Sequence, residues 1–247
     1  MLKFSTSPER GRSYCGQSPW VLDLYQKYFG DNHDGFLVEI GVGCVLDWKI
    51  MSPPPYTPRL VDFEKDDIVR GESTTIELLE NGWTGIYIEP IEEFLTNELH
   101  PLLKSLLPME QYKKIQIVPY AASDYEGSAE IISQETISPV SDEPSSVTNF
   151  TPFVPYSYRN RKIKCKPTSQ ILSDCNCPKD IDVMSVDVEG HELHVLRGLD
   201  FSAHRPKLIL LECNRITINQ LIEVLPSYYR LVHTDGLNAA FVVSELM

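Results

Sequence analysis

Long apolar runs are missing from this 247-residue sequence, and its cysteines are few. The best apolar run, residues 208–211, has the length of a strand, far below the ~20 residues that a membrane-spanning helix needs. The first fourteen residues show no apolar core followed by a small-residue cleavage site, so we see no secretory signal. Six cysteines are too sparse for a disulfide scaffold, and Cys175 and Cys177 have no second pair at zinc spacing. We therefore expect reduced thiols and a cytoplasmic location.

Positive charge is also scarce. The chain has 22 Lys and Arg against 35 Asp and Glu, which gives a formal net charge of −13. A clustered positive surface is what sequence-independent nucleic-acid binding and docking on anionic lipid require, so both are disfavoured. The apolar share of 42% and the charged share of 23% are ordinary globular values, which exclude wholesale disorder.

Strand-like and helix-like segments alternate along the chain. This rhythm predicts an α/β fold with a mostly parallel sheet, helices on both faces and a C-terminal antiparallel hairpin. We expect an N-terminal helical adapter over residues 1–35 and one domain over 36–247, with insertions at 44–72 and 133–158. Residues 73–81 and 91–107 are predicted helices, and the first should begin with a capping box between Thr74 and Glu77.

Polar residues gather where the predicted strands end. Four of five such ends carry an acid within a residue or two, and the carboxyl ends of parallel strands are where α/β folds bind ligands. The five ends are Glu39 to Gly43, Glu89-Pro90, Ala122-Ser123-Asp124, Asp187 to Gly190, and Glu212 to Asn214. We expect the functional site along this edge.

Gly41 and Gly43 follow the first predicted strand, and a loop without Cβ atoms lets a cofactor approach the backbone. The third glycine of the dinucleotide fingerprint is missing, so a tight strand exit explains the pair about as well. Glu89 closes the second strand and comes roughly 20 positions after Glu39 once the first insertion is set aside. An acid there can accept hydrogen bonds from both ribose hydroxyls. The alternative is a solvated carboxylate.

Glu39 departs from the dinucleotide pattern because it lies inside the strand, just before the glycines. A carboxylate there would repel a pyrophosphate and would attract the cationic amino-acid tail of S-adenosylmethionine. The loop also lacks a basic residue near Gly41. These residues favour a methyl donor over a nicotinamide dinucleotide.

Five segments, in this order, resemble FkbM-type methyltransferases. They are residues 36–43, 83–90, 120–124, 182–192 and 208–212, and the most specific is Asp187-Val-Glu-Gly-His-Glu192. The resemblance covers roughly residues 36–243 apart from the two insertions. It implies a Rossmann-like class I fold with a seven-stranded sheet, S-adenosylmethionine as cofactor, and O-methylation of a hydroxyl on a sugar, glycan or small metabolite. The insertion at 44–72 interrupts the family's first loop, which would resume at Gly71 and Ser73.

The predicted cofactor-binding residues combine the strand ends with this resemblance. They are Glu39, Gly41, Gly43, Ser73, Glu89, Pro90, Ala122, Ser123, Asp124 and Asp187.

A hydroxyl is a poor nucleophile and needs a general base or a metal. The predicted catalytic residues are Asp187, Glu189 and His191. His191 is the side chain best tuned to neutral pH, although a structural histidine at a helix start is equally expected. Asp187 at a buried strand end indicates function, and a helix cap is the alternative.

The acceptor is expected to meet a second set of polar residues, which are Glu212, Asn214, Asn238, Arg159 and Arg161. The arginines belong to a basic run that could steer an anionic acceptor, or could guard a solvated strand edge. Asn238 could equally be a hairpin turn residue. No metal site is favoured, and Asp187, Glu212 and Asn214 form an alternative oxygen set for Mg²⁺ or Ca²⁺.

The sequence thus predicts an S-adenosylmethionine-dependent O-methyltransferase whose partner is a sugar or small molecule, with nucleic acid and membrane partners unlikely on charge grounds. Two alternatives stay open: an RNA cap or ribose 2′-O-methyltransferase, and a non-catalytic nucleoside-binding module, because a fold alone does not establish activity. The sequence does not indicate an oligomeric state.

Overall fold

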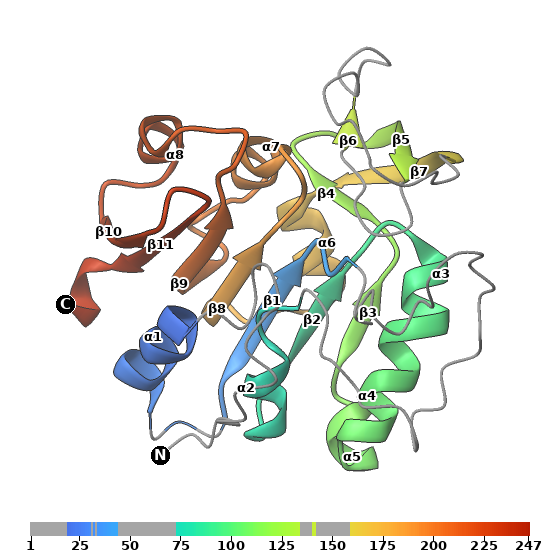
Figure 1. Ribbon diagram of the computed structural model, residues 1–247, viewed down its shortest axis with the longest axis horizontal. Helices are drawn as coiled ribbons and strands as arrows, with labels where there is room; N and C mark the ends of the chain where they lie inside the picture. The colour runs from blue at the N-terminus through green and yellow to red at the C-terminus, as the bar shows by residue number, and fades with distance from the viewer. Residues whose placement is uncertain (1–18, 31, 33, 44–72, 134–139, 142–158) are drawn as a thin grey trace, which may run out of the picture.

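The computed structural model of the chain describes residues 19–30, 32, 34–43, 73–133, 140–141 and 159–247. A seven-stranded sheet in the order β10-β11-β9-β8-β1-β2-β3 forms the centre of the molecule (Figure 1). Its strands are β1 (Phe36–Ile40), β2 (Thr84–Ile88), β3 (Gln116–Val118), β8 (Asp180–Val186), β9 (Arg205–Glu212), β10 (Tyr229–Thr234) and β11 (Asn238–Val243). The strand β11 is antiparallel to both neighbours, and the other pairs are parallel. The predicted α/β sheet with a closing hairpin is confirmed.

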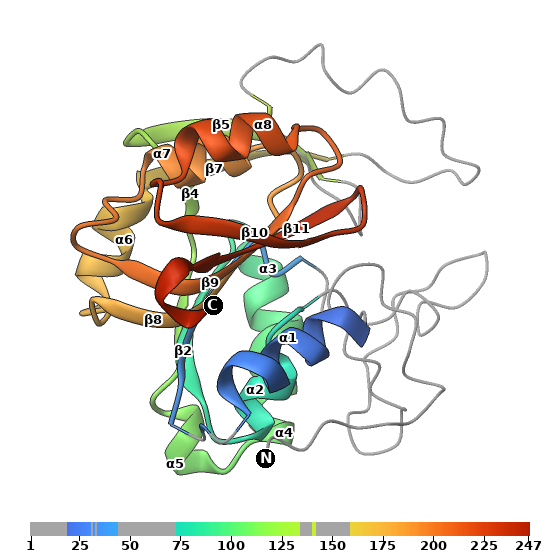
Figure 2. The same ribbon diagram turned by 90° about the vertical axis from the view of Figure 1, so that its left-hand side faces the viewer.

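Helices cover both faces of this sheet. They are α1 (Pro19–Phe29), α2 (Ile76–Glu80), α3 (Glu92–Phe94), α4 (His100–Leu106), α5 (Met109–Tyr112), α6 (Thr168–Asp174), α7 (Glu192–Arg197) and α8 (Ile218–Val224), with a 3₁₀ turn at Ser244–Leu246. In Figure 2, α1, α2 and α4 lie on one side of the sheet and α6, α7 and α8 on the other. Alternate residues of β1 serve the two sides: Leu37 belongs to the core under α1 and Val38 to the core under α7.

The N-terminal helix α1 shares a core with the sheet. Val21, Tyr25 and Phe29 are buried in the same cluster as Leu37, and the Tyr25 hydroxyl donates to the Thr74 carbonyl at 2.9 Å. The domain boundary at residue 35 stays a prediction, but α1 is packed as an integral layer. None of the helices in the described part of the chain is long and apolar enough to cross a membrane.

The predicted helix 91–107 is one helical stretch with a wider middle. The π-helical segment Leu95–Leu99 separates α3 from α4, and Pro101 lies in the first turn of α4. Proline has no N–H and clashes with the carbonyl four residues earlier. A local widening of the helix next to Pro101 relieves this clash and accommodates the missing backbone hydrogen bond.

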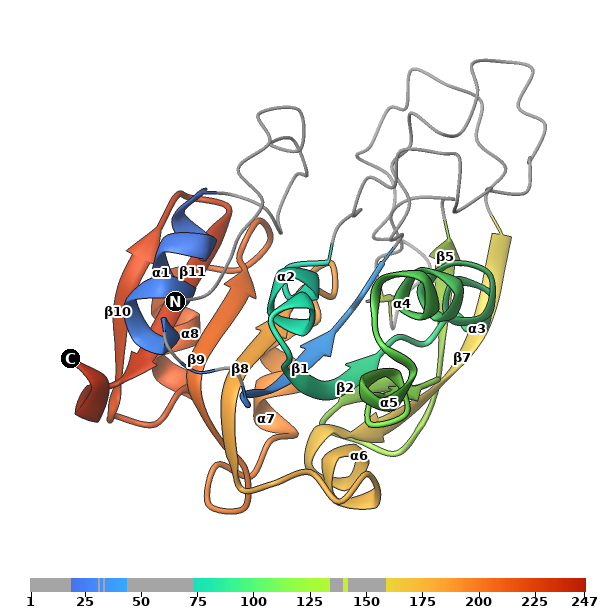
Figure 3. The same cartoon turned by 90° about the horizontal axis from the view of Figure 1, so that it is seen from below.

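A second, four-stranded sheet stands beside the first. Its strands are β4 (Ala121–Ser123), β5 (Gly127–Ser133), β6 (Val140–Ser141) and β7 (Arg159–Pro167), in the order β4-β7-β5-β6. In Figure 3, β5 and β7 lie on the same side of the molecule as α3 and α4, opposite β10 and β11. Insertion 44–72 and most of insertion 133–158 lie outside the described residues, as do residues 1–18. The basic run agrees with the alternative of a solvated strand edge. Residues 159–165 pair with β5 on one side, whereas β4 pairs only with residues 165–167, so residues 159–164 have no second partner strand among the described residues. Lys162 and Lys164 are exposed there.

The predicted capping box of α2 is also wrong. Thr75 is the residue before the helix, and no side chain caps its first turn. The hydroxyls of Ser73 and Thr75 donate instead to Glu39 on β1, which pins the start of α2 to the sheet. Four of the cysteines, Cys165, Cys175, Cys177 and Cys213, fall in described residues and are free thiols, as expected.

Candidate active site

The glycine loop after β1 runs beside the end of β8. Gly41 and Gly43 have φ angles of +80° and +59°, the left-handed region that glycine adopts without penalty. A Cβ on Gly41 would lie 1.7 Å from the carbonyl oxygen of Asp187. Close packing of the two strand exits therefore requires glycine at position 41, whatever ligand the loop meets.

Glu89, at the end of β2, faces the glycine loop. Its side chain is 4% exposed, and its oxygens accept from the backbone N–H groups of Ile91 at 2.9 Å and Gly43 at 3.3 Å. Burial raises the pKa of Glu89 to about 7, and the backbone hydrogen bonds oppose that rise. The structure thus brings Glu89 and Gly43 together, as the sequence predicts, with Pro90 next in the chain.

Glu39 is buried behind this loop. Its carboxylate accepts from the Ser73 hydroxyl at 2.7 Å, the Thr74 N–H at 2.9 Å and the Thr75 hydroxyl at 2.5 Å. Burial raises the pKa of Glu39 to about 7, while these three donors pull it back. Both oxygens are therefore engaged with the chain, so Glu39 anchors the segment before α2, and Ser73 serves that anchor.

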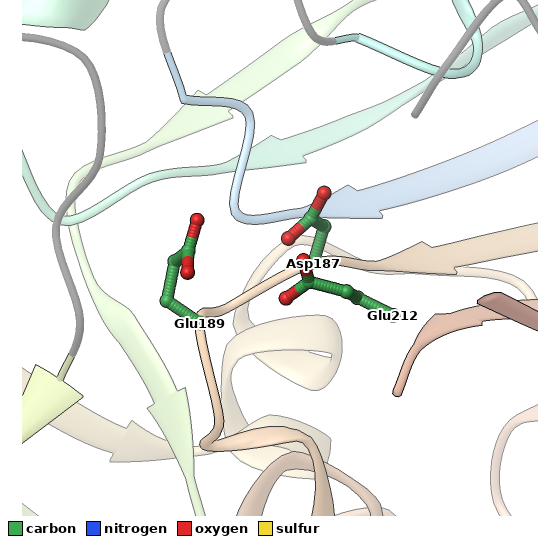
Figure 4. Close-up of side chains that lie close together, drawn as sticks. All are labelled: Asp187, Glu189 and Glu212. Carbon is green, nitrogen blue, oxygen red and sulfur yellow. The ribbon is translucent and has the colours of Figure 1, made fainter. Parts of the chain in front are cut away.

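Three carboxylates converge at the ends of β8 and β9. Asp187, Glu189 and Glu212 each offer an oxygen, and these oxygens all lie within 4.8 Å of one another (Figure 4). Val186 pairs with Leu211 in the sheet, so Asp187 and Glu212 are the next residues in register. Burial raises the pKa of Glu189 to about 7, and burial followed by the negative charge of Asp187 raises the pKa of Glu212 well above its ordinary value.

Glu192 shapes the loop that carries two of these carboxylates. It is 1% exposed, and its Oε1 accepts from the N–H groups of Gly190 at 2.9 Å and Val188 at 3.2 Å. Glu189 and Gly190 have φ angles of +57° and +103°, a turn that only glycine adopts readily. The buried Glu192 acceptor therefore supports a strained turn that aims Glu189 at Asp187.

His191, Ser123 and Asp124 form another group, where β4 meets α7. The His191 Nε2 lies 3.0 Å from the Ser123 hydroxyl, and its ring stacks on His194 with centroids 4.2 Å apart. His194 in turn pairs with Asp124 at 3.0 Å. Ala122 and Ser123 are buried in β4, and His191 is only 4% exposed. This packing matches the structural alternative for His191 more closely than the catalytic role.

A small pocket opens beside the carboxylates. It is lined by Trp20 from α1, Thr74, Ser185, Asp187, Glu212 and Asn238, among other residues. Asn238 begins β11 and pairs with Glu212 in register, so the structure brings these two predicted acceptor residues together. Asn238 is also held in the hairpin, because its N–H donates to Asp235 at 2.7 Å.

The other predicted acceptor residues lie elsewhere. Asn214 donates to Glu212 at 2.7 Å and so holds that carboxylate. Arg161 pairs with Glu93 of α3 at 2.5 Å, and Arg159 is the first residue of β7. Arg161 is therefore engaged with α3 rather than with the three carboxylates.

The sequence missed two residues of this site. Trp20 lies in the first turn of α1, far from the strand ends in sequence, and no motif marks it. Glu192 was visible in the Asp187-Val-Glu-Gly-His-Glu192 segment, but its position at a helix start indicated only electrostatics. Its spacing of two residues from Gly190 is the one signal that could have revealed a bond back to the turn.

Comparison with known proteins gives one family and one structure. The family described as methyltransferase FkbM domain matches residues 62–228, which is more than half of the chain. The crystal structure of methyltransferase FkbM from Methylobacillus flagellatus KT is similar, with 14% sequence identity and a TM-score of 0.49. The match covers 88% of this chain and 47% of that one, so this chain spans about half the length of that protein. No curated protein matches the sequence.

Proposed function

Because the chain belongs to the FkbM methyltransferase family, we propose that it transfers a methyl group from S-adenosylmethionine to a hydroxyl of a sugar, glycan or small metabolite. The observation that carries the proposal is the meeting of Glu89, the glycine loop and the backbone of Asp187 at one edge of the sheet. This is the edge where open α/β sheets bind their ligands.

The chemistry of these residues fits the donor. Glu89 can exchange its backbone partners Gly43 and Ile91 for the two hydroxyls of a ribose. Gly41 and Gly43 keep the loop free of Cβ atoms. The carboxylate at the end of β2 suits a ligand with hydroxyls, and the carboxylates along this edge would repel a pyrophosphate. Glu39 contributes from behind the loop, by holding Ser73 to Thr75 in place.

The carboxylates at the ends of β8 and β9 are the groups available for orienting the acceptor and taking up its proton. Bound S-adenosylmethionine supplies a methyl group that is already activated, so the chain must orient the acceptor and take up its proton. We assign the uptake of the proton to Asp187, which lines the pocket, with Glu189 close beside it, while His191 is engaged with Ser123. Trp20 and Asn238 give that pocket an apolar wall and a polar group, as small-molecule sites require.

Calorimetry with S-adenosylhomocysteine tests the donor site. Wild-type protein should bind it, and Glu89→Ala should weaken binding at least about tenfold because both ribose contacts are lost. Glu110→Ala, an exposed acid on α5, is the matched control and should bind like wild type. An unchanged affinity in Glu89→Ala would remove the ribose assignment, and no binding by wild type would remove the donor itself.

Turnover on a library of hydroxyl compounds tests the catalytic assignment. Asp187→Asn should lower the release of S-adenosylhomocysteine by roughly 100-fold or more, the scale of a lost general base, with little change in donor affinity. Full turnover in Asp187→Asn would move the base to another residue. Donor binding without turnover on any compound would favour the nucleoside-binding module.

A further inference from the structure

Three carboxylates in one small volume need compensation. Asp187, Glu189 and Glu212 place oxygens within 4.8 Å of one another, and like charges at that separation repel strongly in a partly buried site. Arg215 Nη2 lies 3.9 Å from Glu189 Oε2, at the limit of an ion pair, so it offsets part of one charge. The arrangement therefore favours a further positive species among the three.

Glu212 supplies an independent observation. The residue is only 8% exposed, and its Oε2 is buried with no hydrogen-bond partner among the described residues. Its other oxygen accepts from Asn214 at 2.7 Å. Figure 4 shows the Glu212 carboxylate turned toward Asp187 and Glu189. A buried acceptor without a donor is costly, and this one points at the space that the other two carboxylates face.

We propose that Asp187, Glu189 and Glu212 bind one hard divalent cation of the Mg²⁺ type. Carboxylate oxygens are the ligands such cations prefer, and three of them leave positions for water or another oxygen. Asn214 is not a ligand here. It holds Glu212 through its side-chain N–H, as the second layer of a metal site does.

The cation would also provide a binding position for the hydroxyl of the acceptor. Asp187 and Glu212 line the same pocket as Trp20 and Asn238, so a hydroxyl entering that pocket reaches the open positions. Coordination would lower the pKa of this hydroxyl and fix its direction. This role rests on the proposed methyl transfer, whereas binding of the cation does not.

Electron paramagnetic resonance with Mn²⁺ tests binding on the full chain without any methyl donor. We expect one equivalent to bind and Mg²⁺ to displace it. Glu212→Gln and Asp187→Asn should each weaken the affinity at least about tenfold, because each removes one charged ligand. Glu245→Gln removes an acid that pairs with Arg205 at the opposite end of β9, and it should bind like wild type. Circular dichroism verifies that each variant is folded.

Terbium luminescence places the site without a ligand variant. Tb³⁺ bound at the carboxylates lies beside Trp20, so excitation of tryptophan should produce terbium emission, and Trp20→Phe should weaken it.

Failure of wild type to bind Mn²⁺ at 1 mM would overturn the proposal, and so would equal affinities in wild type and Glu212→Gln. In that case Asp187 and Glu212 share a proton instead. Cation binding without S-adenosylhomocysteine binding would leave the cation site standing and remove the methyl donor.

Discussion

Glu39 and Glu89 are acids held in the interior by hydrogen bonds rather than by positive charges. For both, burial raises the pKa from 4.5 to about 7. An acid whose pKa is higher in the folded chain than in the unfolded chain binds more protons when folded. The free energy of unfolding therefore falls as the pH rises from about 4.5 to about 7, and is level above that.

Glu39→Gln should remove part of this pH dependence. The amide keeps an acceptor for the Thr74 N–H and can donate to the hydroxyls of Ser73 and Thr75 if they rotate. Relative to wild type, the fall in unfolding free energy between pH 5 and pH 7 should shrink by up to about 3 kcal/mol. Urea unfolding at several pH values measures it. Equal slopes in the two proteins would show that Glu39 ionises at its ordinary pKa.

For single residues, the sequence predicted which residue types lie at the strand ends better than it predicted what each of them does. The acids at the strand ends could be predicted, because parallel strands bring their carboxyl ends to one edge. Which acids touch a ligand could not, since Glu39 is engaged by Ser73, Thr74 and Thr75, which lie more than thirty positions later. His191 shows the same limit, because its partner Ser123 comes from another sheet.

The turn between β8 and α7 is the element that presents two of the three carboxylates. Its shape depends on left-handed Glu189 and Gly190, and on the two N–H groups that donate to Glu192. Non-glycine residues in that backbone region store strain, which other contacts must hold in place. Glu192 is therefore the support of the turn, although it begins a helix.

Glu192→Ala should loosen this turn while leaving the sheet intact. Loss of an acceptor for two half-buried N–H groups should lower the unfolding free energy by roughly 1–2 kcal/mol. Hydrogen exchange at Val188 and Gly190 should accelerate. Glu192→Gln keeps the same oxygen and should restore slow exchange. Fast exchange in Glu192→Gln as well would mean that charge, rather than the acceptor, holds the turn.

Elements with strong periodicity could be predicted, and elements set by distant contacts could not. The apolar runs of β1, β8 and β9 mark strands buried on both faces. By contrast, the start of α2 is decided by Glu39, which lies more than thirty positions earlier. The capping box that begins α8, between Thr217 and Gln220, is a local signal of three-residue spacing that the sequence does carry. The strands that β7 joins are distant in sequence, so its partners could not be predicted, whereas the basic residues 159–164 do mark a strand side without a described partner.

At the scale of the whole molecule, the two cores on opposite faces of the main sheet hold the strands that carry the site. Trp83, Tyr25 and Leu79 fill one core, and Val38, Met184 and Ile209 fill the other. Strands β1, β8 and β9 are clamped between these cores. The carboxyl ends of these strands therefore hold Asp187 and Glu212 at fixed positions, as a preorganised site requires.

The overall charge predicts weak binding to RNA. A net charge of −13 opposes the counterion release that drives nucleic-acid association, and the exposed Lys162 and Lys164 of β7 are too few to reverse it. Fluorescence anisotropy with a labelled single-stranded RNA of about 20 nucleotides, in about 50 mM salt, should give a dissociation constant weaker than roughly 100 µM. Lys162→Glu with Lys164→Glu is the paired variant, and it should abolish whatever binding remains. Micromolar binding that falls steeply with added salt, and that this double variant loses, would instead favour an RNA methyltransferase.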